Sequence, residues 1–173
     1  MKRSKKILIV CHCLLNANAK VYPLARCGGV YRPVLDQYIA GDVGLVQLPC
    51  PETAYLGLNR WGMTREQYDH SLFRRSCEEL LAPIIDQVKA FARAGYQLVG
   101  IIGMDGSPNC GVNRTCHGFS GGEISARGCV EAQRSALTFQ PGKGVFMEIL
   151  SGILAREQLA IPFMAVDEEE NVE

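Results

Sequence analysis

The sequence LVGII at residues 98–102 runs directly into GMDGSPNCG at residues 103–111. The first part is a short, continuously apolar run of the kind that forms a strand buried on both faces of a parallel sheet. The second part is rich in Gly, Asp, Ser, Pro and Asn, which favour turns. We therefore predict a buried strand that ends in a tight loop and presents the thiol of Cys110.

Two other apolar runs end in the same manner. ILIV at residues 7–10 leads into Cys-His-Cys, and LVQL at residues 45–48 leads into Pro-Cys-Pro-Glu. In an open parallel sheet, the carboxyl ends of neighbouring strands border one crevice in which α/β proteins bind ligands. We therefore expect Cys13, Cys50 and Cys110 to meet in that crevice and to hold a metal centre.

The remaining sequence alternates between strand and helix patterns. Short, apolar and β-branched runs predict strands at residues 6–13, 43–48, 97–102 and 161–166. Helical spacing predicts helices at residues 33–40, 64–94, 130–137 and 146–154, and Pro83 should kink the second of them or start a new helix. This alternation predicts one α/β domain over residues 1–173, with right-handed crossovers and the strand order 2-1-3-4.

Two segments lie outside this alternation. Residues 110–144 contain seven glycines and show no strong period. An irregular segment of this length in a compact domain is typical of a functional loop or lid. The acidic residues 167–173 form a tail that we expect to fray.

The composition restricts the function. A chain of 173 residues that is 47% hydrophobic can bury a stable core without disulfides, so its eight dispersed cysteines favour a reducing, cytoplasmic setting, although an even count also permits bridges. Residues 2–6 are basic and precede an apolar run, as in a secretory signal, but Cys-His-Cys at residues 11–13 interrupts that run. Eighteen basic and eighteen acidic residues cancel, which argues against a nucleic-acid polymer as partner. No segment approaches the ~20 apolar residues of a membrane span.

The cysteines are the candidate metal ligands. Three thiolates can hold three irons of a 4Fe-4S cluster and leave the fourth iron open, whereas three thiolates with His12 or water would suit zinc. Prolines on both sides of Cys50, and Ser-Pro-Asn before Cys110, indicate stiff turns that suit a preorganised ligand. Cys77 lies in an apolar helix face and is predicted to be a core residue. The residues alone do not distinguish a zinc site from an iron–sulfur cluster.

Polar residues next to these cysteines are candidates for proton transfer. Glu52 lies two residues after Cys50 and Ser107 lies three before Cys110, so both should border a metal held there. The alternative roles are a turn cap for Glu52 and a serine turn for Ser107. Asp105 precedes a glycine and favours a turn-forming role.

Further residues carry weaker signals. Arg60-Trp61 could stack on a planar ligand, and His12 could act as a hydrogen-bond donor behind the ligands. The amides of Gly142-Lys143-Gly144, just before a predicted helix, could bind an anion. His70 and His117 are expected on the surface.

Three motifs stand out together: Cys-Leu-Leu-Asn at residues 13–16, Leu-Pro-Cys-Pro-Glu at 48–52 and Gly-Ser-Pro-Asn-Cys-Gly at 106–111. They resemble the successive signature blocks of the thiouracil desulfidase family. Gly118-Phe119 and residues 142–144 fall where that family has later glycine-containing blocks, so the resemblance spans most of the chain. Two further segments look like those of a related branch of the family, namely residues 57–63 and 66–69.

The resemblance implies a Rossmann-like three-layer α/β fold with a small, mostly parallel sheet of about four strands. It also implies a 4Fe-4S cluster, sensitive to oxygen, that is held by Cys13, Cys50 and Cys110 and whose open iron takes the substrate's sulfur. Glu52 and Ser107 would then assist the proton transfers and the water attack that turn a thiocarbonyl into a carbonyl. The sulfur would leave as sulfide, without net redox change.

The chain departs from the family pattern around the expected pocket. Asn16 replaces a glycine, Arg26-Cys27-Gly28-Gly29 replaces an Arg-Tyr-Asp-Gly turn, and the region of Trp61 replaces a Gly-Leu-Pro-x-Pro-Arg segment. These differences bear on which substrate fits. A fourth ligand, which would close the site, could come from Cys11, Cys27 or Cys116.

The resulting prediction is a cytoplasmic iron–sulfur desulfidase that acts on a small thiolated compound, with a thiolated nucleobase as one candidate. The oligomeric state is left open. The alternative is a non-catalytic iron–sulfur or zinc protein that serves as a sulfur carrier, redox sensor or scaffold. A third interpretation is thiol–disulfide chemistry at Cys11 and Cys13.

Overall fold

Four parallel strands form the central sheet of the protein. The structure is a computed structural model that describes residues 3–168. Its sheet has the order β2-β1-β3-β6, with strand bounds β1 Lys6–Val10, β2 Gly44–Gln47, β3 Gln97–Met104 and β6 Phe163–Val166. The predicted order 2-1-3-4 is therefore confirmed. In the register, Val10 faces Gln47 on one side and Ile102 on the other, so these three strands reach the same edge of the sheet at nearly the same level.

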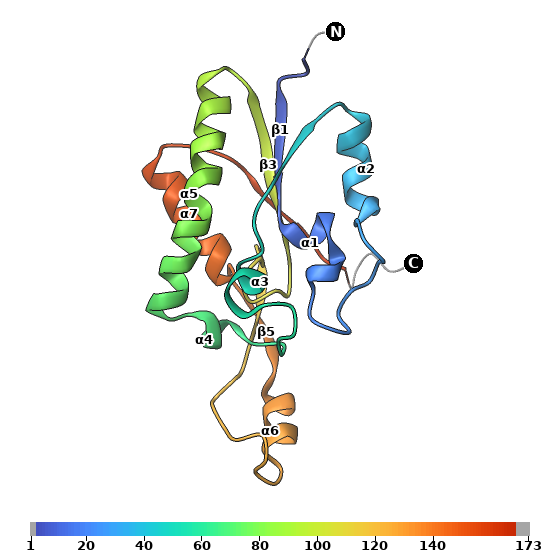
Figure 1. Cartoon of the computed structure of the whole chain (residues 1–173), viewed down its shortest axis with the longest axis vertical. Coiled ribbons are helices and arrows are strands. Elements are labelled where there is room, and N and C mark those ends of the chain that lie inside the picture. Colours follow the sequence, from blue (N-terminus) through green and yellow to red (C-terminus); the bar gives the residue numbers. More distant parts are fainter. Residues whose placement is uncertain (1–2, 169–173) are drawn as a thin grey trace.

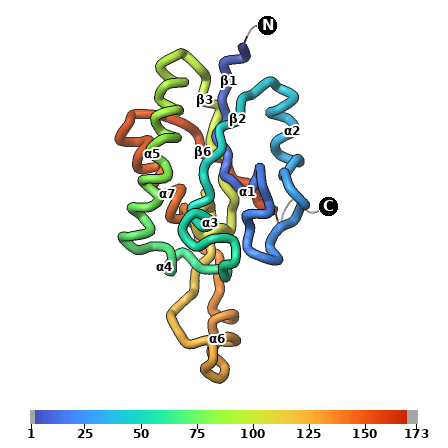
Figure 2. The backbone as a smooth tube through the Cα atoms, in the orientation of Figure 1, coloured from blue at the N-terminus to red at the C-terminus, as the bar shows by residue number. Residues whose placement is uncertain are grey.

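Helices cover both faces of this sheet, which confirms the predicted three-layer α/β fold (Figure 1). The long helices α5 (Ser71–Arg93) and α7 (Val145–Arg156) pack together on one face. On the other face lie α2 (Arg32–Ala40) and the short α1 (His12–Leu15), as the backbone tube in Figure 2 also shows. Three further short elements surround the carboxyl edge of the sheet, namely η1 (Ala17–Ala19), α3 (Pro51–Leu56) and α4 (Arg65–Tyr68).

Helix α5 is continuous through Pro83, so no new helix starts there. Pro83 lies on the solvent side of the helix. The backbone carbonyl that the proline leaves without its usual partner can therefore bind water. The buried stripe of the helix has helical spacing and consists of Phe73, Cys77, Leu81, Ile85 and Val88. Cys77 is fully buried in this stripe, as predicted for a core residue.

One predicted boundary at the carboxyl edge was wrong, and one helix there was not predicted. The first strand ends at Val10 rather than at residue 13, and α1 begins at His12 with Cys11 as its N-cap residue. A short apolar run does not by itself distinguish a strand from a helix start. Helix α3 was not predicted. Pro51 occupies its first position, and the sulfur of Cys50 accepts a hydrogen bond from the backbone N–H of Thr53.

Residues 114–141 form an arm that projects from the body of the molecule beyond α3 and α4 (Figure 1). The arm is an antiparallel hairpin of β4 (Arg114–His117) and β5 (Thr138–Pro141), and α6 (Cys129–Ala136) lies between its strands. The short helix predicted at residues 130–137 is thus confirmed within one residue. The hairpin was missed because β5 is exposed along its whole length and lacks the apolar alternation of a half-buried strand. Among residues 3–168, no helix combines the length and apolar character needed to cross a membrane.

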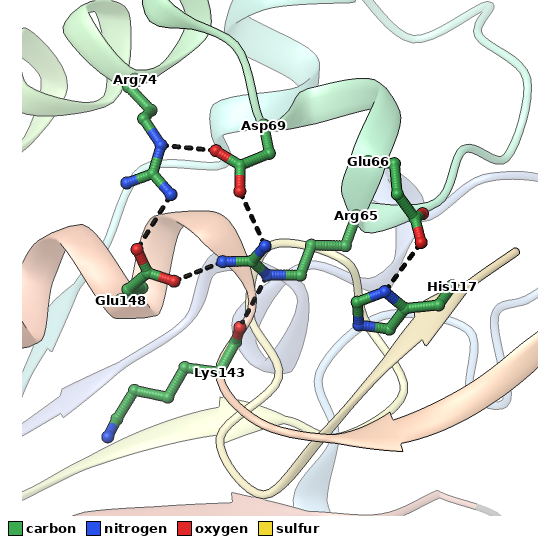
Figure 3. Close-up of polar contacts among 7 residues, drawn as sticks. All are labelled: Arg65, Glu66, Asp69, Arg74, His117, Lys143 and Glu148. Carbon is green, nitrogen blue, oxygen red and sulfur yellow. Dashed lines mark hydrogen bonds and ion pairs between the residues drawn. The ribbon is translucent and has the colours of Figure 1, made fainter. Parts of the chain in front are cut away.

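Ion pairs connect α4 to the rest of the protein (Figure 3). Asp69 accepts hydrogen bonds from Arg65 at 2.7 Å and from Arg74 at 2.5 Å, and both arginines also pair with Glu148 of α7. On the other side of α4, a carboxylate oxygen of Glu66 lies 2.8 Å from Nδ1 of His117. These contacts attach α4 to both α7 and the arm.

Glu66 provides a test of this attachment. Partial burial raises the pKa of Glu66, but hydrogen bonds from its own backbone N–H, Thr64, His117 and Gly118 outweigh burial and lower the pKa to about 2. Because the folded-state pKa lies below the unfolded value, the stabilisation is complete above the unfolded pKa of roughly 4.3 and is lost as the pH falls toward the folded value. We expect the Tm of the wild type to fall more steeply over this range than the Tm of Glu66→Gln.

The matched control is Glu79→Gln, because Glu79 is exposed on α5 and has no ion pair among residues 3–168. Its Tm should follow the wild-type curve as the pH falls. The measurement is the Tm from thermal denaturation at a series of pH values. An equal fall in Tm for the wild type and Glu66→Gln would contradict the stabilising role of Glu66.

Candidate functional site

Cys13, Cys50 and Cys110 all line one cavity of about 220 Å³ at the carboxyl edge of the sheet. Cys13 lies in α1 directly after β1, Cys50 lies between β2 and α3, and Cys110 lies in the loop after β3. Glu52 and Ser107 line the same cavity. The structure therefore brings together all five residues that the sequence singled out, and we call this space the thiol cavity.

A fourth cysteine adjoins the cavity from behind. Cys11 is fully buried, and its sulfur lies 3.5 Å from that of Cys13. Cys27 and Cys116, the other two candidates for a fourth ligand, do not line the cavity. All eight cysteines are free thiols, so the arrangement does not depend on disulfides.

The clustered thiols resist ionisation. A hydrogen bond with Cys110 raises the pKa of Cys11, and a hydrogen bond with Cys11 together with burial raises the pKa of Cys13. For Cys110, the hydrogen bond with Cys11 lowers the pKa, but burial and the nearby Cys13 and Cys50 outweigh it and the pKa is raised. Neighbouring thiolates repel one another, so these thiols ionise together only beside a positive charge. A bound metal supplies such a charge, and its binding releases the thiol protons.

The cavity cysteines supply soft thiolate donors, which both iron–sulfur clusters and zinc accept. Among residues 3–168, no three His, Cys, Asp or Glu side chains converge as ligands of one metal ion. A cluster is larger than one ion, so its thiolates stand farther apart, and soft thiolates are the ligands that iron–sulfur clusters use. Three thiols line the cavity, which is the number of ligands that the resemblance assigns to a 4Fe-4S cluster, and the cluster remains a prediction.

Glu52 is held at the cavity by two partners. Its Oε2 accepts a hydrogen bond of 3.0 Å from Nε of Arg60, and its Oε1 accepts one of 3.1 Å from Nδ2 of Asn109. Only 14% of the Glu52 side chain and 5% of the Arg60 side chain are exposed. The alternative role as a turn cap does not apply, because the sulfur of Cys50 caps α3 instead. Arg60, which we considered for stacking, is committed to this ion pair.

A buried tyrosine lies behind Glu52. Burial raises the pKa of Tyr68, and the nearby charge of Glu52 raises it further. The Tyr68 hydroxyl has no hydrogen-bond partner within residues 3–168, and neither has Oδ1 of Asn109. Glu52 thus stands between the thiol cavity and a buried tyrosine.

The Ser107 hydroxyl is oriented by the loop that carries Cys110. Its Oγ accepts hydrogen bonds from the backbone N–H groups of Asn109, at 3.2 Å, and of Cys110, at 2.9 Å. The predicted serine turn is therefore present. Because a hydroxyl oxygen has two lone pairs, Ser107 can offer only its proton to a ligand in the cavity.

Asp105 stabilises the far side of this loop. Its Oδ1 accepts hydrogen bonds from the backbone N–H groups of Val112, at 2.8 Å, and Asn113, at 2.9 Å. The turn-forming role predicted for Asp105 is thus confirmed. With one oxygen occupied in this way, Asp105 acts as a brace for the loop that places Ser107 and Cys110.

The predicted anion site at residues 142–144 was wrong. The N–H groups of Gly142 and Gly144 donate to the carbonyls of Asn113 and Gly111, and the N–H of Val145 donates to the carbonyl of Pro108. These amides are used to fasten the start of α7 to the Cys110 loop. They are therefore not available to an anion.

The three histidines and Trp61 lie in different environments. His12 lines the cavity, its Nδ1 lies 2.5 Å from the side-chain nitrogen of Gln47, and burial lowers its pKa. His70 is exposed, as predicted, and caps α5 through the N–H of Phe73. His117 is half-buried, contrary to expectation, because it contacts Glu66. Trp61 is 79% exposed and is not a core residue.

Two ion pairs form part of the cavity wall. Lys20 pairs with Glu168 and Arg114 pairs with Asp167, and all four residues line the cavity. Asp167 and Glu168 are therefore anchored, in contrast to the fraying expected from residue 167 onward, while residues 169–173 lie outside the described part of the chain. The aromatic ring of Phe139, on the arm, forms an apolar part of the wall.

Sequence reasoning missed the contacts that complete the site, and it considered Arg60 only for stacking on a ligand. Arg60, Lys20, Arg114 and Phe139 reach the cavity from segments that are far apart in the chain. No local pattern marks such contacts. The only available signal was the proximity of Arg60 to Glu52 in the sequence.

The chain resembles a known archaeal protein. It is 37% identical over 110 residues to Uncharacterized protein MJ0003 of Methanocaldococcus jannaschii, and the match covers 64% of this chain and 70% of that protein. The chain belongs to the family of MJ0003. No protein-family model and no solved structure matches the chain. The resemblance to the desulfidases therefore rests on the motifs in the sequence.

Proposed function

We propose that the protein is an iron–sulfur desulfidase that removes sulfur from a small thiolated compound, without net redox change. The proposal places a 4Fe-4S cluster on Cys13, Cys50 and Cys110, and puts the protein in the cytoplasm. The observation that carries it is that these three thiols share one cavity with Glu52 and Ser107. When bound, such a cluster would supply an open iron that holds the substrate's sulfur.

The proposed reaction balances as a hydrolysis. A thiocarbonyl and water give a carbonyl and hydrogen sulfide: the carbon–sulfur bond breaks, a carbon–oxygen bond forms, and both protons of the water end on sulfur. No electron is gained or lost overall. The protein must therefore accept a proton from the attacking water and stabilise charge on the substrate, which are tasks for general base catalysis and for hydrogen-bond donors.

Glu52 and Ser107 are suited to different parts of this reaction. Two nitrogens of Arg60 contact Oε2 of Glu52, whereas Oε1 accepts a hydrogen bond from Asn109 alone. Oε1 therefore retains a lone pair that can accept a proton from water. Ser107 can only donate, because two backbone amides occupy its lone pairs. We therefore assign proton acceptance to Glu52 and substrate stabilisation to Ser107.

The role of Ser107 predicts a specific pattern among variants. Ser107→Ala should lower kcat on the order of 10²-fold, the typical loss when one donor to developing charge is removed. Ser107→Thr keeps the hydroxyl and should retain much of the activity. The measurement is steady-state sulfide release, with iron content determined for each protein. Equal activity in Ser107→Ala and wild type, at equal iron content, would contradict the donor role.

The function itself is tested by anaerobic reconstitution. The protein is incubated with iron and sulfide, and iron, acid-labile sulfide and the absorption spectrum are measured. We expect about four irons per chain, and release of hydrogen sulfide from 2-thiouracil or a related thio compound with formation of the carbonyl product. A reconstituted protein that holds the cluster but releases no sulfide from a panel of thiolated compounds would instead support the non-catalytic carrier or sensor.

A further inference from the structure

We propose that Arg60 is a positioning residue, which fixes the Glu52 carboxylate in the wall of the thiol cavity and acts on the reaction only through it. This inference rests on the proposed function, because it concerns how Glu52 performs its part in that reaction. It adds a residue to the site that neither the sequence motifs nor the comparison with MJ0003 assigns to the chemistry.

The guanidinium of Arg60 is almost fully engaged. Its Nε and Nη2 both lie 3.0 Å from Oε2 of Glu52. Nη2 also donates to the carbonyl of Ala19 at 2.8 Å, and Nη1 donates to the carbonyl of Gly57 at 3.2 Å. The residue thus joins η1, the end of α3 and the Glu52 side chain in one rigid unit. Because the Arg60 side chain is only 5% exposed, water competes little for these contacts.

A second contact restrains Glu52 from the opposite side. Nδ2 of the fully buried Asn109 donates to Oε1 at 3.1 Å, and Asn109 lies next to Cys110 in the loop after β3. One oxygen is therefore held by Arg60 and the other by the loop that carries a proposed cluster ligand. A carboxylate held at both oxygens keeps one orientation toward the substrate, whereas a free glutamate samples several side-chain conformations.

The contacts require arginine rather than any cation. A planar guanidinium with five N–H donors can bind the carboxylate and two carbonyls simultaneously. A lysine ammonium would keep the charge but has one nitrogen for these widely separated acceptors. Arg60→Lys should therefore position Glu52 less well than the wild type and better than Arg60→Gln.

The test is a double-mutant cycle on the full-length, reconstituted protein. Wild type, Arg60→Gln, Glu52→Gln and the double variant are compared for kcat and KM in sulfide release from 2-thiouracil, or from whichever thiolated compound the wild type converts. Iron content is measured for each protein. Arg60→Gln should lower kcat on the order of 10²-fold, the scale of losses from misplacing a reacting group, with little change in KM or iron content. In the Glu52→Gln background, the same change should have no further effect on kcat.

The matched control is Arg32→Gln. Arg32 lies on α2, where its exposed side chain pairs with Asp36 four residues away, and it does not line the cavity. This variant should leave kcat, KM and iron content unchanged. Three results would overturn the inference: an unchanged kcat in Arg60→Gln, a loss of iron in Arg60→Gln, or an equal fall in kcat when Glu52 has already been replaced.

Thermal denaturation of the same four proteins gives a readout that does not require activity. If Arg60 holds Glu52, the lowering of Tm in the double variant should be smaller than the sum of the two single effects. Additive lowering would overturn the contact. A wild type that retains its cluster and converts no thiolated compound would contradict the proposed function, while the thermal cycle would still decide whether Arg60 positions Glu52.

Discussion

Cys110→Ser is expected to abolish binding of the iron–sulfur cluster, reducing iron from about four atoms per reconstituted chain to background. A serine hydroxyl is a hard donor that stays protonated at neutral pH, so it does not replace a thiolate on a soft metal centre. Cys110 is 9% exposed and comes from the loop after β3, where Asp105 and Ser107 fix the backbone. Cys13→Ser and Cys50→Ser should have the same effect, because each removes one of the three proposed ligands.

Two further cysteine variants show whether the effect is specific. Cys129→Ser changes a partly exposed thiol on α6 of the arm and should leave iron content unchanged. Cys11→Ala removes the thiol behind Cys13 while keeping the site apolar. It should retain the cluster if three cysteines are sufficient. Loss of the cluster in Cys11→Ala would indicate four ligands, which would close the open iron and contradict the desulfidase mechanism.

The second large effect is expected from Gly144→Ala. A Cβ at this position would lie 2.5 Å from the carbonyl carbon of Asn109 and 2.6 Å from its oxygen, so the backbone itself would have to move. Here α7 begins against the loop that places Ser107 and Cys110, and the N–H of Met147 donates to the carbonyl of Asn109. We expect a loss of stability of roughly 1–3 kcal/mol or more, together with strongly reduced cluster binding.

Gly29→Ala serves as the control for this change. Gly29 has no atom within 4 Å of an added Cβ, and its backbone is not in the left-handed region. Chemical denaturation and iron analysis should show Gly29→Ala close to the wild type. Normal stability and iron content in Gly144→Ala would contradict the close approach of α7 to the Cys110 loop.

Several features of the fold and site were predictable because they depend on local pattern and on the geometry of parallel sheets. Continuously apolar runs predicted the four strands, since buried parallel strands are apolar on both faces. The order 2-1-3-4 agreed with the structure, but it does not follow from the runs themselves. The position of Cys13, Cys50 and Cys110 after three of these strands predicted that they would share one edge. Cys77 was assigned to the core by its spacing on a helical face.

Element boundaries and the arm were less predictable. The strand after residue 6 was extended too far, because Cys11 continues the apolar run although the chain turns there into α1. Helix α3 is only six residues long, too short to show a period, and the hairpin of the arm buries little. Short elements of this kind are stabilised by contacts with the remainder of the protein rather than by their own sequence.

The sequence by itself determined the four strands and the position of three thiols, Glu52 and Ser107 just after three of them, because strand ends and their flanking residues are local features of the chain. Only the tertiary structure decided what those groups can do. The two amides on Ser107, the Arg60 and Asn109 contacts of Glu52 and the burial of Cys11 beside Cys13 all join segments that the sequence does not pair. Such contacts depend on distances of a few ångströms between separate elements, and these are set only when the whole chain has packed.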